Sequence, residues 1–125
     1  MKLRTIAAAL VLGAGALVGT AGPASAATCS GTHLDNWPIK GGYISVYYNS
    51  STGYNCAMTY TNRPGVLQYI RVTLGVEGGT SKTDARNYKY YAGPVSVYGK
   101  GKCIEFYGQV GSSNPLEGVG NAYCG

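Results

Sequence analysis

The chain has 125 residues, of which 45% are hydrophobic but only 12% charged, and its ten Lys and Arg residues outnumber five Asp and Glu residues. This length allows a single domain. The formal net charge of +5 is a mild excess without any run of basic residues, so the composition gives no case for a protein that binds nucleic acid.

The first 26 residues have the pattern of a secretory signal peptide. Two basic residues precede an uncharged stretch from Ile6 to Val18, and Ala24-Ser25-Ala26 supplies the small residues that stand before a cleavage site. The apolar stretch of about 13 residues is shorter than the roughly 20 that cross a bilayer. We expect cleavage after Ala26, which leaves a single exported domain, residues 27–125, with a net charge of +3. No later segment is apolar enough to stay in a membrane, so we expect no membrane partner after cleavage.

The first half of this domain predicts a loop followed by three strands. The segment that contains His33, Asp35 and Trp37 is expected to be a loop. Residues 42–48 and 54–61 alternate in the manner of β-strands around the turn cluster 49–53, which predicts a hairpin. A turn with proline and glycine at 62–65 then leads to a third predicted strand at 67–76.

The second half predicts shorter strands. The polar segment 82–87 is expected to be a loop, and residues 88–91 a short strand that Gly93-Pro94 stops. The remaining predicted strands are 95–98, 103–110 and 119–124, separated by a turn at 99–102 and a loop at 111–115. About seven short strands without helical periodicity predict an all-β fold, a small antiparallel sandwich or barrel.

Four cysteines lie in the expected exported domain: Cys29, Cys56, Cys103 and Cys124. An even number of cysteines in a small exported domain predicts two disulfides. Structural zinc is the alternative, but its ligands usually form pairs about two to four residues apart, whereas the gaps here are 27, 47 and 21. Three pairings are possible, and we favour Cys29 with Cys56 and Cys103 with Cys124, because each closes a short loop.

Residues that could carry catalysis are few and scattered. His33 is the only histidine, and the sequence has no Gly-x-Ser-x-Gly motif to accompany it. The spacing of the five acids neither excludes nor supports a paired-carboxylate hydrolase. Phosphate loops, dinucleotide motifs and calcium loops are absent from the sequence. We therefore expect a protein that is not an enzyme and has no catalytic residue, no metal and no cofactor. The five acids are Asp35, Glu77, Asp84, Glu105 and Glu117.

Two aromatic features are candidate binding sites. Trp37 lies in the predicted N-terminal loop, where a disulfide at Cys29 would restrain it as in the binding loops of inhibitors. Packing of Trp37 against one end of the core is the alternative. Tyr43 and Tyr47 share one face of a predicted strand and, with neighbours such as Tyr88, Tyr90 and Tyr91, could stack on the sugar rings of a wall polymer. Packing in the core and at sheet edges is the alternative for the tyrosines.

Several stretches carry a family resemblance: residues 47–56 (YYNSSTGYNC), residues 91–95 (YAGPV), Cys103-Ile104 and the final Tyr123-Cys124-Gly125. In this order they resemble the spore-associated protein A family of small proteins exported by spore-forming actinobacteria. The resemblance spans most of residues 27–125 and includes all four cysteines. It implies a protein found with spores and aerial growth, and it transfers no catalytic or binding residue.

Three functional hypotheses follow. The leading one is a secreted, non-enzymatic β domain associated with the spore or cell-wall surface. The second is a secreted inhibitor of a protease or glycosidase that presents the segment around Trp37. The third is a module that binds cell-wall polysaccharide through its tyrosines.

Overall fold

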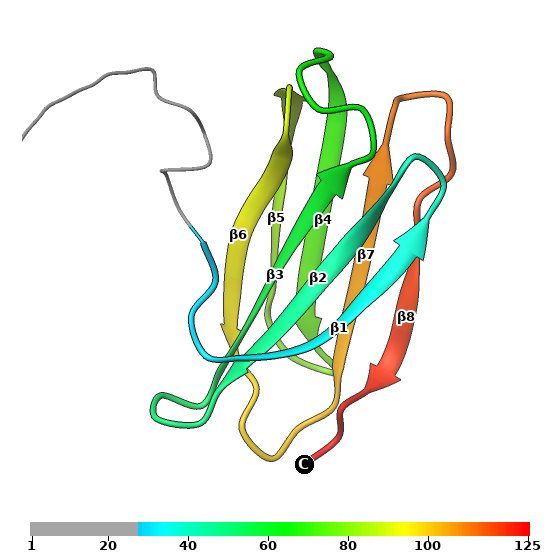
Figure 1. Cartoon of the computed structure of the whole chain (residues 1–125). Coiled ribbons are helices and arrows are strands. Elements are labelled where there is room, and N and C mark those ends of the chain that lie inside the picture. Colours follow the sequence, from blue (N-terminus) through cyan, green and yellow to red (C-terminus); the bar gives the residue numbers. More distant parts are fainter. Residues whose placement is uncertain (1–27) are drawn as a thin grey trace, which may run out of the picture.

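A computed structural model describes residues 28–125, which form a sandwich of two antiparallel four-stranded sheets (Figure 1). The predicted signal peptide, residues 1–26, lies outside the described residues. The first sheet has the order β1-β2-β3-β6, with β1 at Thr32–Ile39, β2 at Gly42–Asn49, β3 at Tyr54–Thr61 and β6 at Tyr91–Tyr98. The second has the order β5-β4-β7-β8, with β5 at Ser81–Tyr88, β4 at Gln68–Val76, β7 at Ile104–Val110 and β8 at Glu117–Ala122. The predicted all-β sandwich is confirmed.

The core lies between the sheets and is built from alternate residues of the central strands. On β2, Ile44 and Val46 point inward, and on β4, Ile70, Val72 and Leu74 do the same; all five are fully buried. Phe106 on β7 is the largest fully buried side chain. This period of two is the pattern expected for strands with one buried face. Burial of such a side chain stabilises the fold by about 2 kcal/mol.

The prediction of a loop at 82–87 is wrong, because this segment is most of strand β5. The strand pairs with β4 from Ser81 to Tyr88 and forms an edge of the second sheet. Most of its side chains are exposed, so it lacks the apolar alternation that marks a half-buried strand. Charged residues on an edge strand also hinder pairing with another chain. The predicted short strand at 88–91 is correspondingly wrong: Lys89 and Tyr90 form the turn between β5 and β6.

Gly93-Pro94 does not stop a strand, contrary to the sequence prediction, but lies inside β6. The bond between these two residues is cis. Strand β6 is an edge of the first sheet, and its register against β3 shifts between Ala57 and Thr59. Proline donates no backbone hydrogen bond, and edge strands and bulges are the places where a sheet accommodates it.

The predicted N-terminal loop is also wrong, because His33, Asp35 and Trp37 lie in strand β1. This strand pairs with β2 along its length, with a register shift between His33 and Asp35. The bulge interrupts the alternation of side chains, so the sequence lacks a regular period of two here. The shift places His33 opposite Tyr47 and Asp35 opposite Val46.

Both favoured disulfides are present, Cys29–Cys56 and Cys103–Cys124, and no cysteine is free among the described residues. The first attaches the segment before β1 to the outer face of β3. The second attaches the segment after β8 to the residue just before β7. Residues 28–125 contain no helix long and apolar enough to cross a membrane.

Candidate functional site

Half of the tyrosines lie on the outer face of the first sheet, the face that points away from the core. Strand pairing places Tyr43 opposite Tyr60 and Tyr60 opposite Tyr91. The same face carries Tyr47 near its middle and an exposed pair, Tyr54 and Tyr98, near one end. The predicted common face of Tyr43 and Tyr47 is therefore part of a larger aromatic surface that crosses three strands.

Three of these tyrosines form a ladder across β2, β3 and β6, which we call the tyrosine ladder: Tyr43, Tyr60 and Tyr91. The ring centroids of Tyr43 and Tyr60 are 5.2 Å apart and the rings are nearly parallel, at 19°. The rings of Tyr60 and Tyr91 are 5.6 Å apart and tilted by 54°. Such aromatic contacts contribute about 0.5–1.5 kcal/mol beyond the area that they bury.

The ladder covers a buried methionine. Met58 lies on the outer face of β3, yet only 1% of it is exposed. The hydroxyl group of Tyr60 approaches the Met58 sulfur at 3.4 Å, so this ring leans along its own strand over the thioether. Because Tyr43 and Tyr60 stack on each other, part of each ring face is already covered. The ladder thus offers ring edges and phenol groups to the solvent more than flat ring faces.

A small polar network adjoins the ladder on β1 and β2. The Ser45 hydroxyl donates a hydrogen bond to Asn36 Oδ1 at 2.7 Å, and His33 Nε2 lies 2.8 Å from the same oxygen. The His33 ring packs on Tyr47, with centroids 5.1 Å apart. The only histidine is therefore held by an amide and an aromatic ring, and no nucleophile of the described residues is bonded to it.

Ionisation of Tyr60, the central residue of the ladder, is suppressed. Burial raises the pKa of Tyr60 above its ordinary value of 10.0, and the neighbouring phenols of Tyr47, Tyr43 and Tyr91 raise it further. A phenolate here would lose hydration, and it would be repelled by any neighbouring phenol that is also ionised. At neutral pH the Tyr60 hydroxyl group is therefore uncharged, and such a group both donates and accepts hydrogen bonds.

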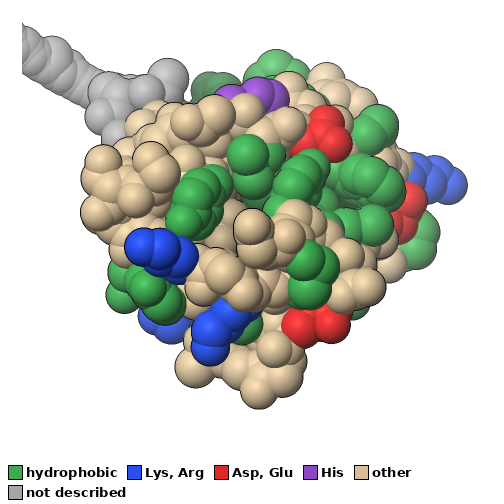
Figure 2. All heavy atoms as spheres, turned by 90° about the horizontal axis from the view of Figure 1, so that it is seen from below, with side chains coloured by type: hydrophobic (Ala, Val, Ile, Leu, Met, Phe, Trp, Pro, Cys, Tyr) green, Lys and Arg blue, Asp and Glu red, His purple; other side chains and the backbone are tan. Residues whose placement is uncertain are grey.

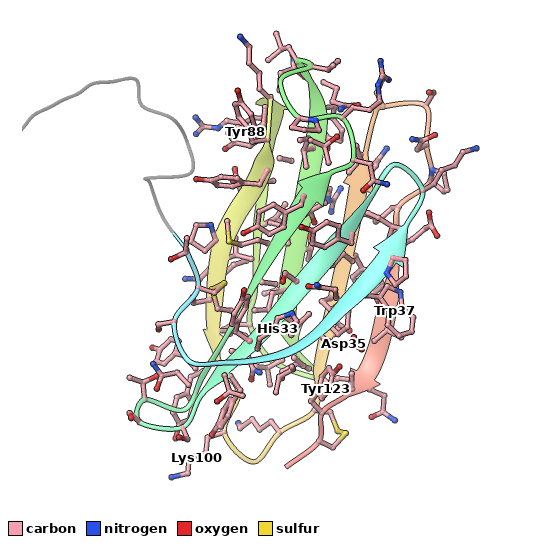
Figure 3. All side chains as sticks on the ribbon, in the orientation of Figure 1. His33, Asp35, Trp37, Tyr88, Lys100 and Tyr123 are labelled. Atoms are coloured by element: carbon pink, nitrogen blue, oxygen red, sulfur yellow. A yellow bond between two sulfur atoms is a disulfide. The ribbon has the colours of Figure 1, made fainter. Side chains whose placement is uncertain are left out.

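Trp37 points away from this face and packs against the core. Its ring meets Phe106 edge-on, with centroids 6.2 Å apart. Tyr123 stacks on the same phenylalanine at 6.3 Å and donates a hydrogen bond to Asp35 Oδ2 at 3.2 Å. Figure 3 shows Trp37, Asp35 and Tyr123 on the side of the sandwich where β1 and β8 lie. The three side chains close the gap between the two sheets there.

A recess opens at the end of the sandwich where the chain ends. Its volume is about 480 Å³, and its walls come from the first sheet, the β6–β7 loop and the C-terminal segment. Figure 2 looks onto this end and shows hydrophobic side chains gathered near its centre, with acidic side chains to one side. The lining residues are Leu34, Tyr48, Asn55, Gly99, Lys100, Gly101, Tyr123, Cys124 and Gly125.

The three tyrosines predicted to neighbour Tyr43 and Tyr47 lie in different places. Tyr91 joins the ladder, whereas the Tyr88 hydroxyl bonds to Asp84 on its own strand. Tyr90 lies in the β5–β6 turn and is 39% exposed. Tyr60 was not predicted as a site residue. The alternation along residues 54–61 places it on the same face of its strand as Cys56 and Met58, but its position beside Tyr43 depends on the register of β3 against β2. Within residues 28–125 no three His, Cys, Asp or Glu side chains gather as metal ligands.

Comparison with known proteins adds a relative. The chain is 35% identical over 122 residues to spore-associated protein A of Streptomyces coelicolor, an alignment that covers 86% of this chain and 79% of that protein. No family model matches the chain. No solved structure matches it either.

Proposed function

The chain belongs to the spore-associated protein A family, and on this basis we propose that it is an exported, non-enzymatic protein that associates with the spore or cell-wall surface. The observation that carries the proposal is the match to spore-associated protein A along most of the length of both chains. The disulfides support the export step, because such bonds persist in oxidising compartments outside the cytoplasm.

The tyrosine ladder and Tyr47 are the surface that we assign to this association. A wall polysaccharide offers many hydroxyl groups, and the phenols of the ladder can exchange hydrogen bonds with them. Stacking of the rings on sugars has less room, since Tyr43 and Tyr60 already stack on each other. Several weak hydrogen bonds at fixed spacing suit adhesion to a repeating polymer, where many copies of the protein act together.

The test is a binding assay on whole spores. Purified protein is mixed with washed spores of Streptomyces coelicolor and, separately, with vegetative hyphae, and each pellet is washed first with salt and then with mild detergent. We expect the protein to remain on the spores through the salt wash. Recovery of nearly all the protein in the unbound fraction or the salt wash would contradict the proposal.

A matched pair of variants locates the surface. The Tyr43→Phe, Tyr47→Phe, Tyr91→Phe triple variant keeps the rings and removes three hydroxyl groups. At about 1 kcal/mol per hydrogen bond, this should weaken binding on the order of a hundredfold. The control carries Tyr69→Phe and Tyr107→Phe on the outer face of the second sheet and should bind like the unmodified protein. Equal losses in both variants would rule out the ladder as the binding surface.

A further inference from the structure

A second exposed feature lies at the end of the sandwich opposite the C-terminus, where Figure 1 shows the β3–β4 connection. Three hydrophobic side chains gather there, which we call the loop tip: Val66, 40% exposed, Leu67, 61% exposed, and Tyr90, 39% exposed. A shallow recess of about 420 Å³ lies between Leu67 and the β5–β6 turn, residues 87–91. Figure 3 labels Tyr88, one of the side chains in its wall. Clustered apolar exposure of this kind marks an interaction surface more often than scattered exposure does.

The loop tip is held in place by backbone hydrogen bonds. The Val66 amide donates to the Arg63 carbonyl at 3.2 Å, which closes the turn within the β3–β4 connection. The Gly65 amide donates to the Lys89 carbonyl at 2.9 Å and so joins this connection to the β5–β6 turn. The Thr61 amide donates to the Tyr90 carbonyl at 3.2 Å. The two apolar segments are therefore fixed side by side before any partner arrives.

The charges around the loop tip are positive. Arg63 and Lys89 are exposed and stand on the two connections that form it. The sequence has no Asp or Glu between residues 62 and 76 or between residues 85 and 104, the stretches that contain these connections. A projecting apolar tip flanked by cations is complementary to a surface that is anionic outside and apolar beneath.

We propose that the loop tip inserts into the interfacial layer of an anionic lipid bilayer. Aliphatic side chains such as Val66 and Leu67 gain by leaving water for acyl chains, and tyrosine is a residue that favours the interface itself. Arg63 and Lys89 would then meet lipid phosphates. The sequence expectation of no membrane partner rested on the lack of a spanning segment, whereas this contact needs only a few residues at the surface.

Vesicle co-sedimentation tests the proposal. The protein is purified from the medium of a secreting host, and intact mass establishes which N-terminal residues it and every variant carry. Vesicles consist of phosphatidylcholine alone or of phosphatidylcholine and phosphatidylglycerol in equal parts. We expect binding to the anionic vesicles that weakens as salt is added, and little binding to the neutral ones.

Two double variants separate the apolar and charged parts. Val66→Ser with Leu67→Ser should lower the partition coefficient at least tenfold. Arg63→Gln with Lys89→Gln should lower it about thirtyfold at low salt, since each cation near an anionic surface contributes about fivefold. The controls at the opposite end, Tyr98→Ser and the double variant Lys100→Gln, Lys102→Gln, should change it less than the loop-tip variants do. Far-UV circular dichroism checks that each variant is folded.

Three results would overturn the proposal. One is failure of the unmodified protein to bind anionic vesicles. Another is an equal loss in the loop-tip and opposite-end variants, which would indicate only diffuse attraction between net charges. The third is binding that depends on the loop tip but occurs on a purified anionic wall polymer and not on vesicles, which would assign the tip to a polymer. The variants keep the two proposals apart, because the loop-tip variants change none of Tyr43, Tyr47 and Tyr91. Of these three, only Tyr91 also lines the recess beside the loop tip.

Discussion

Two buried threonines on β3 differ in how their hydroxyl groups are satisfied. Thr59 is fully buried, and its Oγ1 has no hydrogen-bond partner among the described residues. Thr61 Oγ1 accepts hydrogen bonds from the Arg63 amide at 3.0 Å and from Gln68 Nε2 at 2.8 Å. Burial of an unpaired hydroxyl group is unfavourable, whereas a bonded one recovers that cost.

The same substitution should therefore have opposite effects at these positions. Thr59→Val replaces the unpaired hydroxyl with a methyl group of similar size and should raise the free energy of unfolding by about 1 kcal/mol. Thr61→Val breaks two hydrogen bonds and should lower it by about 1–2 kcal/mol. Denaturant unfolding of both variants provides the measurement. A loss of stability in Thr59→Val would show that its hydroxyl group has a partner in solution.

Tyr60, in the tyrosine ladder, should make the free energy of unfolding fall at alkaline pH. The pKa of Tyr60 is raised by burial and by its phenol neighbours, so the unfolded chain releases this proton near 10.0 while the folded protein retains it. The contribution is complete below that pH and is lost as the pH rises through the folded pKa. Tyr60→Phe should therefore reduce the decline in unfolding free energy above about pH 10, a remainder coming from Tyr88 and Tyr123, whose pKa values are also raised. Denaturant unfolding across this pH range tests it, and identical slopes would contradict it.

At the scale of elements, one carboxylate joins the two sheets along one side of the sandwich. There β5, an edge strand of the second sheet, lies beside β6, an edge strand of the first. Asp84 Oδ2 accepts a hydrogen bond from the Gly93 amide at 2.8 Å. The Tyr88 hydroxyl donates to the same carboxylate, 2.8 Å from Oδ1 and 2.9 Å from Oδ2. Among the described residues, β5 and β6 are not paired as strands, because they belong to different sheets.

Asp84→Ala should lower the free energy of unfolding by about 2 kcal/mol, because it removes hydrogen bonds to a charged group. Asp84→Asn should cost less, since an amide oxygen can still accept the Gly93 proton. Hydrogen exchange gives the local readout: the Gly93 amide should exchange faster in Asp84→Ala than in the control Lys82→Ala. Unchanged exchange at Gly93 would show that the carboxylate does not join the sheets in solution.

The elements that could be predicted are those with one buried and one exposed face. β2, β3, β4 and β7 alternate between core and surface, and their predicted ranges agree with the structure to within one or two residues. Most β5 side chains are exposed, and β1 contains a bulge, so neither shows a clean period of two. β6 contains Gly93-Pro94, which reads as a break because the sequence does not reveal an edge position.

The candidate site was predictable only within a strand. Tyr43 and Tyr47 are separated by an even number of positions, so any strand places them on one face. The addition of Tyr60 and Tyr91 depends on register between strands, which is set by turn geometry and by packing far along the chain. The position of Trp37 could not be predicted within a strand either, because its contact with Phe106 joins residues of different sheets.

At the scale of the whole molecule, two disulfides hold the outer segments of the described chain. Cys29–Cys56 and Cys103–Cys124 close loops with sequence separations of 27 and 21, so each should contribute about 3 kcal/mol through the unfolded state. The second bond also holds Tyr123 next to its contacts with Phe106 and Asp35.

Paired serine variants should separate these roles. Either pair should lower the free energy of unfolding by about 3 kcal/mol. The Cys103→Ser, Cys124→Ser pair should in addition return the pKa of Tyr123 toward 10.0, because burial and the Asp35 carboxylate raise it in the folded protein. Denaturant unfolding and ultraviolet titration of the phenols measure the two effects. A titration curve the same as that of Cys29→Ser, Cys56→Ser would contradict the role of the second bond.

The order of strands also governs when the protein can fold. β3 pairs with β6 and β4 pairs with β7, so each sheet contains one pairing between strands that are distant in the chain. Pairings of this kind form slowly, because a long loop must close before the contact is made. A growing polypeptide leaves β4 open on one side until Val110 has emerged from the ribosome. We therefore expect folding to be completed late in synthesis. Until then the chain is incompletely folded and can still pass through a narrow channel.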